Sequence, residues 1–155
     1  MEDIPAGLTS EVTEHTSHRD WCPAGKKQVE PVVPDALPGC SLGHRTTVLS
    51  AWLHYGLGTT TSQIVEVFNG HLKLKVREGG VTELWHRLAA VLKPWHEQIH
   101  QRCLKAAVRH ADETGWRNNG LLCWLWCFAC ADATYYLIPP TRGQGALRVF
   151  FTEAS

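Results

Sequence analysis

An acidic pair, Asp112 and Glu113, stands in the segment His110–Trp116 and is the first place to look for chemistry. From residue 107 the sequence period changes to two, with Val108, His110 and Asp112 on one side and Arg109, Ala111 and Glu113 on the other, which predicts a β-strand with the two carboxylates on opposite faces. Asn119-Gly120 then predicts a tight hairpin turn, because both residue types tolerate positive φ. Metal-dependent phosphoryl-transfer enzymes often hold a divalent ion on such a strand-end carboxylate. This segment is therefore a candidate catalytic site.

Histidine and cysteine side chains near the N-terminus form a second candidate, for zinc. The candidate ligands are His15, His18, Cys22 and Cys40, with His44 completing a weaker pair with Cys40. Tetrahedral zinc needs four such ligands, usually in closely spaced pairs. The alternative is a loose arm with solvated histidines and a buried thiol, and we favour it, so no zinc is expected.

Four segments of different composition must position these residues. Residues 1–20 are polar without hydrophobic period and predict a loose arm. Residues 21–44 are proline-rich and predict an extended linker, since proline fixes φ and lacks an N–H. Residues 45–106 have helical periodicity, whereas 107–155 predict three antiparallel strands and a final helix. The expected fold class is α+β, with a mostly helical N-terminal half.

The helical region contains its own start and stop signals. Gly56 and Gly58 end a first helix, and Thr60 with Gln63 forms a capping box for a second. Apolar residues spaced by three and four predict a third helix over residues 80–92. Pro94 then predicts a helix end and a restart, with the restarted helix continuing to about residue 106.

The strands after the hairpin turn are strongly apolar. Leu121–Cys130 reads as a strand covered on both faces, and Thr134–Ile138 as a third strand that Pro139-Pro140 stops. A last helix is expected over Gly145–Glu153. In the second strand Cys123 and Cys127 share a face and Cys130 takes the other, which is typical of core thiols.

The helices over residues 60–69 and 80–92 are compatible with a helix-turn-helix. Lys73, Lys75 and Arg77 lie in their connection, and Arg87 and Lys93 lie beyond it, where they could contact DNA phosphates with salt-sensitive affinity. The connection is longer than the usual three or four residues. A packed helical bundle with a solvated basic loop is therefore an equal alternative.

Composition and charge limit which other classes of protein the chain can belong to. The formal net charge is zero, so any nucleic-acid surface must be local. The sequence has no apolar run of membrane-spanning length, and its polar N-terminus does not resemble a signal peptide. We expect a cytoplasmic protein without a membrane partner, whose six cysteines are reduced thiols.

Several collinear motifs resemble the insertion-sequence-66 family of transposases, over about residues 15–153. In the N-terminal half they are Val33-Pro-Asp-Ala-Leu-Pro-Gly39, Ala51-Trp-Leu-His-Tyr-Gly-Leu-Gly58 and Gln63-Ile-Val-Glu-Val-Phe68. In the C-terminal half they are His110-Ala-Asp-Glu-Thr-Gly-Trp116, Trp124-Leu-Trp-Cys-Phe128, Thr134-Tyr-Tyr-Leu-Ile138 and Arg142-Gly143.

The resemblance implies DNA transposition by a DDE mechanism, in which three carboxylates of an RNase H-like domain hold two Mg²⁺ (or Mn²⁺) ions. By match to the motif, Asp112 is the first carboxylate and metal ligand, and transposon-end DNA is the partner. The resemblance places the second Asp and the Glu beyond residue 155. Residues 107–155 are then expected to be a truncated catalytic domain, inactive alone, with the strand of Asp112 at a sheet edge.

Some positions depart from the family pattern. Gly25 replaces the second thiol of a Cys-Pro-x-Cys knuckle that begins at Cys22, and Arg109 stands where an aliphatic residue is usual. A charge at residue 109 is costly if that face is buried. Gln144-Gly145 replaces a Ser-Pro that often opens the next helix. The alternative function is a non-enzymatic remnant that binds DNA, self-associates or pairs with a full-length transposase.

Overall fold

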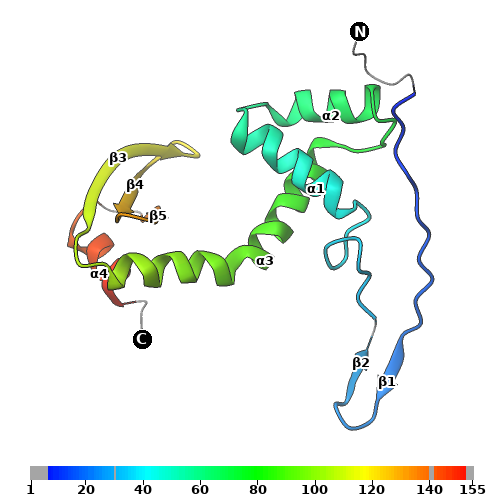
Figure 1. Ribbon diagram of the computed structural model, residues 1–155, viewed down its shortest axis with the longest axis horizontal. Coiled ribbons are helices and arrows are strands. Elements are labelled where there is room, and N and C mark those ends of the chain that lie inside the picture. Colours follow the sequence, from blue (N-terminus) through cyan, green and yellow to red (C-terminus); the bar gives the residue numbers. More distant parts are fainter. Residues whose placement is uncertain (1–6, 30, 140–141, 153–155) are drawn as a thin grey trace. The chain divides into compact units, whose positions relative to one another are not determined.

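A computed structural model describes residues 7–29, 31–139 and 142–152. The chain divides into two compact units, Met1–Val91 and Leu92–Ser155, which are described separately below. Figure 1 follows the elements from β1 to α4 along the chain. The boundary falls inside a helix, earlier in the chain than residue 107, where the sequence period changes.

The first unit begins with a short hairpin. Strands β1 (Asp20–Cys22) and β2 (Lys27–Val29) pair antiparallel, with Cys22 opposite Lys27. The turn between them places Lys26 at a φ of 47°, and the Gly25 N–H donates to Cys22 Sγ at 3.4 Å. The structure thus corrects the expectation of an unpaired extended segment here. Pro23 lies in the turn, where its missing N–H costs no ladder hydrogen bond.

Two helical segments follow. Helix α1 (His44–Ala51) continues into a π-helical turn, η1 (Trp52–Gly56), so the predicted end at Gly56 is confirmed. Helix α2 (Thr61–Gly70) begins with the predicted capping box: Thr60 Oγ1 accepts the Gln63 N–H, and Gln63 Oε1 accepts the Thr60 N–H. These bonds satisfy donors that a helix N-terminus otherwise leaves unpaired.

The core of the first unit lies between α2 and the start of α3 (Glu78–Lys105). Its buried members are Ile64, Phe68, Val76, Val81 and Trp85. The loop between the two helices is held by Asn69, whose side chain bonds both the N–H and the C=O of Val76, at 2.9 and 3.0 Å. The Asn69 amide thus pairs with the backbone N–H and C=O of Val76, as the backbone of a neighbouring β-strand would.

Helix α3 continues through Pro94, so the predicted break and restart are wrong. Proline removes one intrahelical hydrogen bond and crowds the carbonyl four residues earlier. That carbonyl belongs to Ala90, in an exposed part of the helix where water can replace the missing donor. The cost is therefore smaller than in a buried helix. The end at Lys105 agrees with the expected end near residue 106 to within one residue.

The second unit contains a three-stranded antiparallel sheet in the order β3-β4-β5. The strands are β3 (His110–Asn118), β4 (Leu121–Ala129) and β5 (Thr134–Leu137), followed by α4 (Gln144–Thr152). Asn119 and Gly120 have φ of 50° and 80°, as the predicted two-residue turn requires. The α+β class is confirmed, and the RNase H-like assignment stays a prediction. The expected helix end at Glu153, and Pro140, lie outside the described residues.

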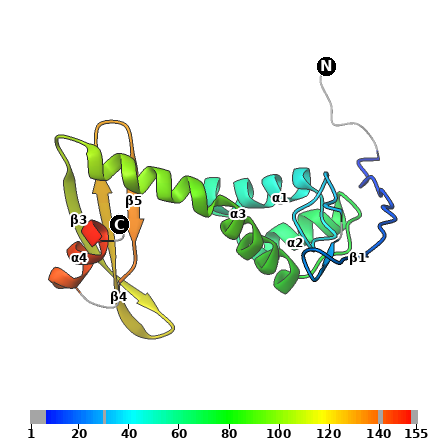
Figure 2. The ribbon, with the colours of Figure 1, turned by 90° about the horizontal axis from the view of Figure 1, so that it is seen from below.

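The end of α3 and α4 cover one face of this sheet, as Figure 2 shows. The core residues are Cys103 from α3, Trp126 and Phe128 from β4, Tyr135 from β5, and Ala146 and Phe150 from α4. The rings of Phe128 and Phe150 stack with centroids 3.8 Å apart. Buried His100 adds a polar link, with its Nε2 2.7 Å from the Phe150 carbonyl oxygen.

Within the described ranges, every helix is too short or too polar to cross a lipid bilayer.

Candidate functional site

Asp112 and Glu113 lie on opposite faces of the sheet, as the period of two predicts. Asp112 is opposite Cys127 in the β3–β4 register, and Glu113 is opposite Trp126. Opposed residues of antiparallel strands share a face. Glu113 therefore lies on the face that carries the core, and Asp112 lies on the other face, where Tyr136 of β5 is 55% exposed.

Asp112 itself is exposed, on a strand that forms an edge of the described sheet. Its Oδ1 accepts the backbone N–H of Glu113 at 2.9 Å, which orients the carboxylate along the strand. β3 pairs with β4 on one side, and among the described residues no strand pairs with its other side. The expected edge position of the Asp112 strand is confirmed for this part of the chain.

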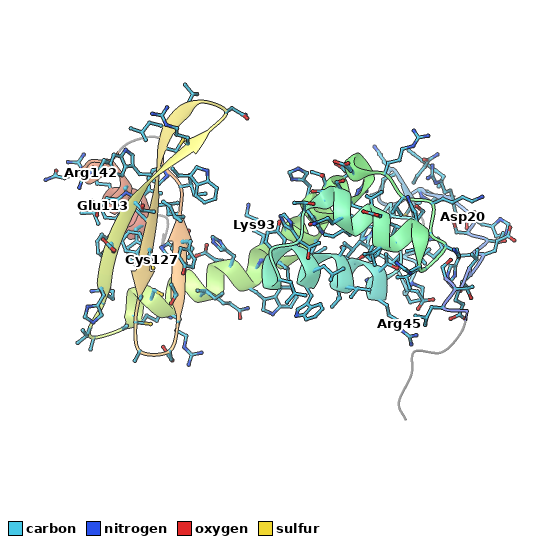
Figure 3. All side chains as sticks on the ribbon, turned by 90° about the horizontal axis from the view of Figure 1, so that it is seen from above. Asp20, Arg45, Lys93, Glu113, Cys127 and Arg142 are labelled. Carbon is cyan, nitrogen blue, oxygen red and sulfur yellow. The ribbon has the colours of Figure 1, made fainter. Side chains whose placement is uncertain are left out.

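Glu113 holds Arg142, which follows β5. The Arg142 Nε and Nη2 donate to the same Glu113 oxygen at 2.9 and 2.8 Å, and the guanidinium lies 4.8 Å from the centre of the Trp124 ring. Figure 3 labels both members of this ion pair and also Cys127 of β4, which lies on the other face of the sheet. The Glu113 side chain is only 22% exposed. Glu113 thus positions the segment after β5 rather than facing the same way as Asp112, and the sequence interpretation missed this partnership.

The contacts of Arg109 explain how a charged residue fits where the family pattern has an aliphatic one. Its Nη1 donates to the Leu104 carbonyl at 2.6 Å, and its guanidinium lies 5.6 Å from the Phe151 ring centre. The side chain is exposed, so no charge is buried there. A cation at the last carbonyls of α3 is favourable because those acceptors lack intrahelical donors.

A divalent-metal centre is the chemistry that the resemblance implies at Asp112, and the described residues do not fit it alone. Among them no group of three or more His, Cys, Asp or Glu side chains is close enough to hold a metal ion. The neighbouring carboxylate of Glu113 lies on the opposite face and is occupied by Arg142. One exposed carboxylate cannot hold two ions in line with a phosphate.

Four of the basic DNA-contact candidates fall into two pairs. Lys73 donates from Nζ to the Gly70 carbonyl at 2.7 Å, and Arg87 donates to the Pro38 carbonyl at 2.9 Å and to Glu83 at 3.1 Å. These two side chains therefore support the fold of the first unit. Lys75 and Arg77 are exposed, and within the described ranges neither side chain forms a hydrogen bond or ion pair.

The four zinc candidates are not gathered into one site among the described residues. His15 Nε2 lies 3.4 Å from Asp35 Oδ2, and Cys22 Sγ accepts the Gly25 N–H. The turn after Cys22 thus keeps an N–H to sulfur bond where the family knuckle has its second thiol. His18 is exposed and Cys40 is half-buried.

Comparison with protein families gives a match to the model described as Transposase IS66 family, over residues 39–155. The matched range includes both helical segments of the first unit and the whole described second unit. The chain is therefore a transposase-family protein. It belongs to the IS66 family. Neither the curated proteins nor the solved structures give a match.

Proposed function

We propose that the chain acts in DNA transposition, with Asp112 as the first carboxylate of a DDE site and the loop after α2 as a DNA-phosphate contact. The observation that supports this most directly is the placement of Asp112. It is exposed on the face of β3 opposite the helices, within the range matched by the family. Mg²⁺ or Mn²⁺ is the metal that this family role implies, and an RNase H-like domain is the fold.

Residues 1–155 alone are expected to be inactive on DNA, because in their described part no group of three or more ligand side chains gathers at Asp112, and the neighbouring carboxylate of Glu113 lies on the opposite face and is paired with Arg142. The purified chain should give no cleavage or strand transfer on transposon-end DNA in Mg²⁺ or Mn²⁺, measured by end-labelled gel assay. Metal-dependent activity that Asp112→Ala abolishes and Glu113→Gln retains would contradict this. Activity that survives Asp112→Ala would identify a contaminant nuclease.

DNA binding is expected to depend on Lys75 and Arg77, the two unengaged basic residues of the loop. Replacing both by alanine should weaken binding at low salt and reduce the slope of log K against log salt by about 2, since each lost phosphate contact removes roughly one unit. A gel-shift salt titration measures this. Lys105→Ala removes an exposed charge from the end of α3, outside the loop, and should leave the slope nearly unchanged. No binding by the unmodified chain at low salt would refute the DNA role.

A second function is favoured by the open edge of β3. Unpaired N–H and C=O groups on an edge strand are a template for another chain. The polypeptide would then act without catalysis, by pairing with itself or with a full-length IS66 transposase. Co-purification with that transposase, in the absence of any DNA binding, would favour this role over the first.

A further inference from the structure

Two thiols meet in the core of the second unit. Cys130 Sγ lies 4.0 Å from Cys103 Sγ, although the residues are 27 positions apart in the chain. Cys103 belongs to the last turns of α3 and is completely buried, whereas Cys130 follows β4 and is partly exposed. A disulfide bond holds its two sulfur atoms about 2 Å apart, so these two must approach each other by about 2 Å.

The surroundings allow that movement at Cys130. Its N–H bonds the Ala133 carbonyl at 2.9 Å in the turn between β4 and β5, so the residue lies in a turn rather than within a paired strand. Its thiol donates to Asp132 Oδ1 at 3.3 Å, and Asp132 is held by Arg102 of α3 at 2.6 Å. The Arg102–Asp132 ion pair keeps this turn beside α3 and therefore keeps the two sulfur atoms together.

We propose that Cys103 and Cys130 form a reversible disulfide by exchange with a low-molecular-weight disulfide such as oxidised glutathione. In the first step Cys130 Sγ bonds to one glutathione sulfur, the S–S bond of the reagent breaks, and one glutathione thiol leaves with the proton. In the second step Cys103 Sγ displaces the glutathione from Cys130, and a second glutathione thiol leaves. Two protein thiols are oxidised and one disulfide is reduced to two thiols.

The order of the steps follows from exposure. Cys130 is the thiol that the reagent can reach, and Cys103 reacts only from inside the core. Burial, then a hydrogen bond with Cys130 and repulsion from Cys130 and Asp132, raises the pKa of the Cys103 thiol to about 11. Since the thiolate is the nucleophile, ring closure should accelerate about tenfold for each pH unit between pH 7 and 9.

The remaining cysteines provide an internal comparison. Cys123 and Cys127 share a strand face but are four residues apart on β4, too far for a bond within one extended strand. Cys22 and Cys40 belong to the first unit. A disulfide specific for Cys103 and Cys130 is therefore distinguishable from general oxidation.

The test is incubation of the folded, reduced full chain with oxidised glutathione, followed by peptide mapping without reduction. We expect one linked peptide pair, Cys103 with Cys130, a loss of two hydrogen atoms in the intact mass, and full reversal by dithiothreitol. The melting temperature of the second unit should rise by roughly 5–10 °C on oxidation, because a crosslink restrains the unfolded chain.

Two variants sharpen the result. Cys103→Ser should stop the reaction at a glutathione adduct on Cys130, and the matched double variant C123S/C127S should form the linked pair as the unmodified chain does. The proposal is overturned if both thiols of the unmodified chain stay free, if the adduct on Cys130 never closes at pH 9, or if other cysteine pairs form equally. Mapping of the unmodified chain decides the question even if a variant fails to fold.

Discussion

Replacing Phe150 by alanine is expected to lower the free energy of unfolding of the second unit by about 3–5 kcal/mol. Phe150 is 1% exposed, and its ring stacks on Phe128 at 3.8 Å while also contacting Tyr135 and His100. Removing the ring leaves a cavity between α4 and the sheet, which the surrounding aromatic side chains cannot fill by small shifts.

Hydrogen exchange of the β4 amide protons measures this effect for the second unit alone, since protection there reports the opening of its core. Phe151→Ala is the matched control, because the neighbouring ring is 55% exposed and contacts Arg109. The control should lose less than about 1 kcal/mol. Equal losses for the two variants would show that α4 does not pack on the sheet through Phe150.

Alkaline pH is expected to destabilise the reduced second unit through Cys103. Burial first, and then Cys130 and Asp132, raise the pKa of this thiol from 9.0 to about 11. Between these values the unfolded chain has lost the proton and the folded chain still holds it. The stability is therefore fully present below pH 9 and falls as pH rises toward 11, by about 1 kcal/mol per pH unit and about 2–3 kcal/mol in all.

Urea unfolding under reducing conditions at pH 8, 9 and 10 tests this against Cys103→Ala. The variant is less stable at pH 8 because it loses buried volume. Because it lacks the thiol, its stability does not depend on the ionisation of Cys103. The stability difference between the two proteins should shrink by about 1 kcal/mol from pH 9 to pH 10. Contributions from groups that the two proteins share cancel in this difference. A difference that is constant with pH would mean that the thiol is not selectively kept neutral by the fold.

The parts of the fold that the sequence predicts correctly depend on near neighbours in the chain. The capping box of Thr60 and Gln63 and the turn at Asn119-Gly120 each involve residues a few positions apart. Pro94 shows the limit of such rules. A proline locally favours a helix end, but α3 continues through Pro94 because this part of the helix is exposed. The π-helical turn after α1 and the hairpin after Asp20 had no signal in the hydrophobic period.

In the candidate site, too, the sequence predicted the features that depend on near neighbours in the chain and missed the long-range contacts. Alternation along β3 was enough to place Asp112 and Glu113 on opposite faces. It could not identify Arg142 as the partner of Glu113, 29 residues away, or the contact between Cys103 and Cys130. Its charge made Arg87 a candidate DNA contact, and that stays a prediction, whereas its bond to the Pro38 carbonyl, 49 residues away, is visible only in three dimensions. Contacts of this length depend on packing that no local pattern encodes.

The two-residue turn between β3 and β4 has a consequence for the order of folding. A hairpin with so short a connection has a low entropy of closure, and isolated hairpins form in about 1–10 μs. We expect β3 and β4 to pair before α4 docks, because α4 must close a much longer stretch of chain. The register that opposes Asp112 to Cys127 is then established early, from local interactions. The face of the sheet from which Asp112 projects is therefore fixed before the aromatic core on the opposite face is complete.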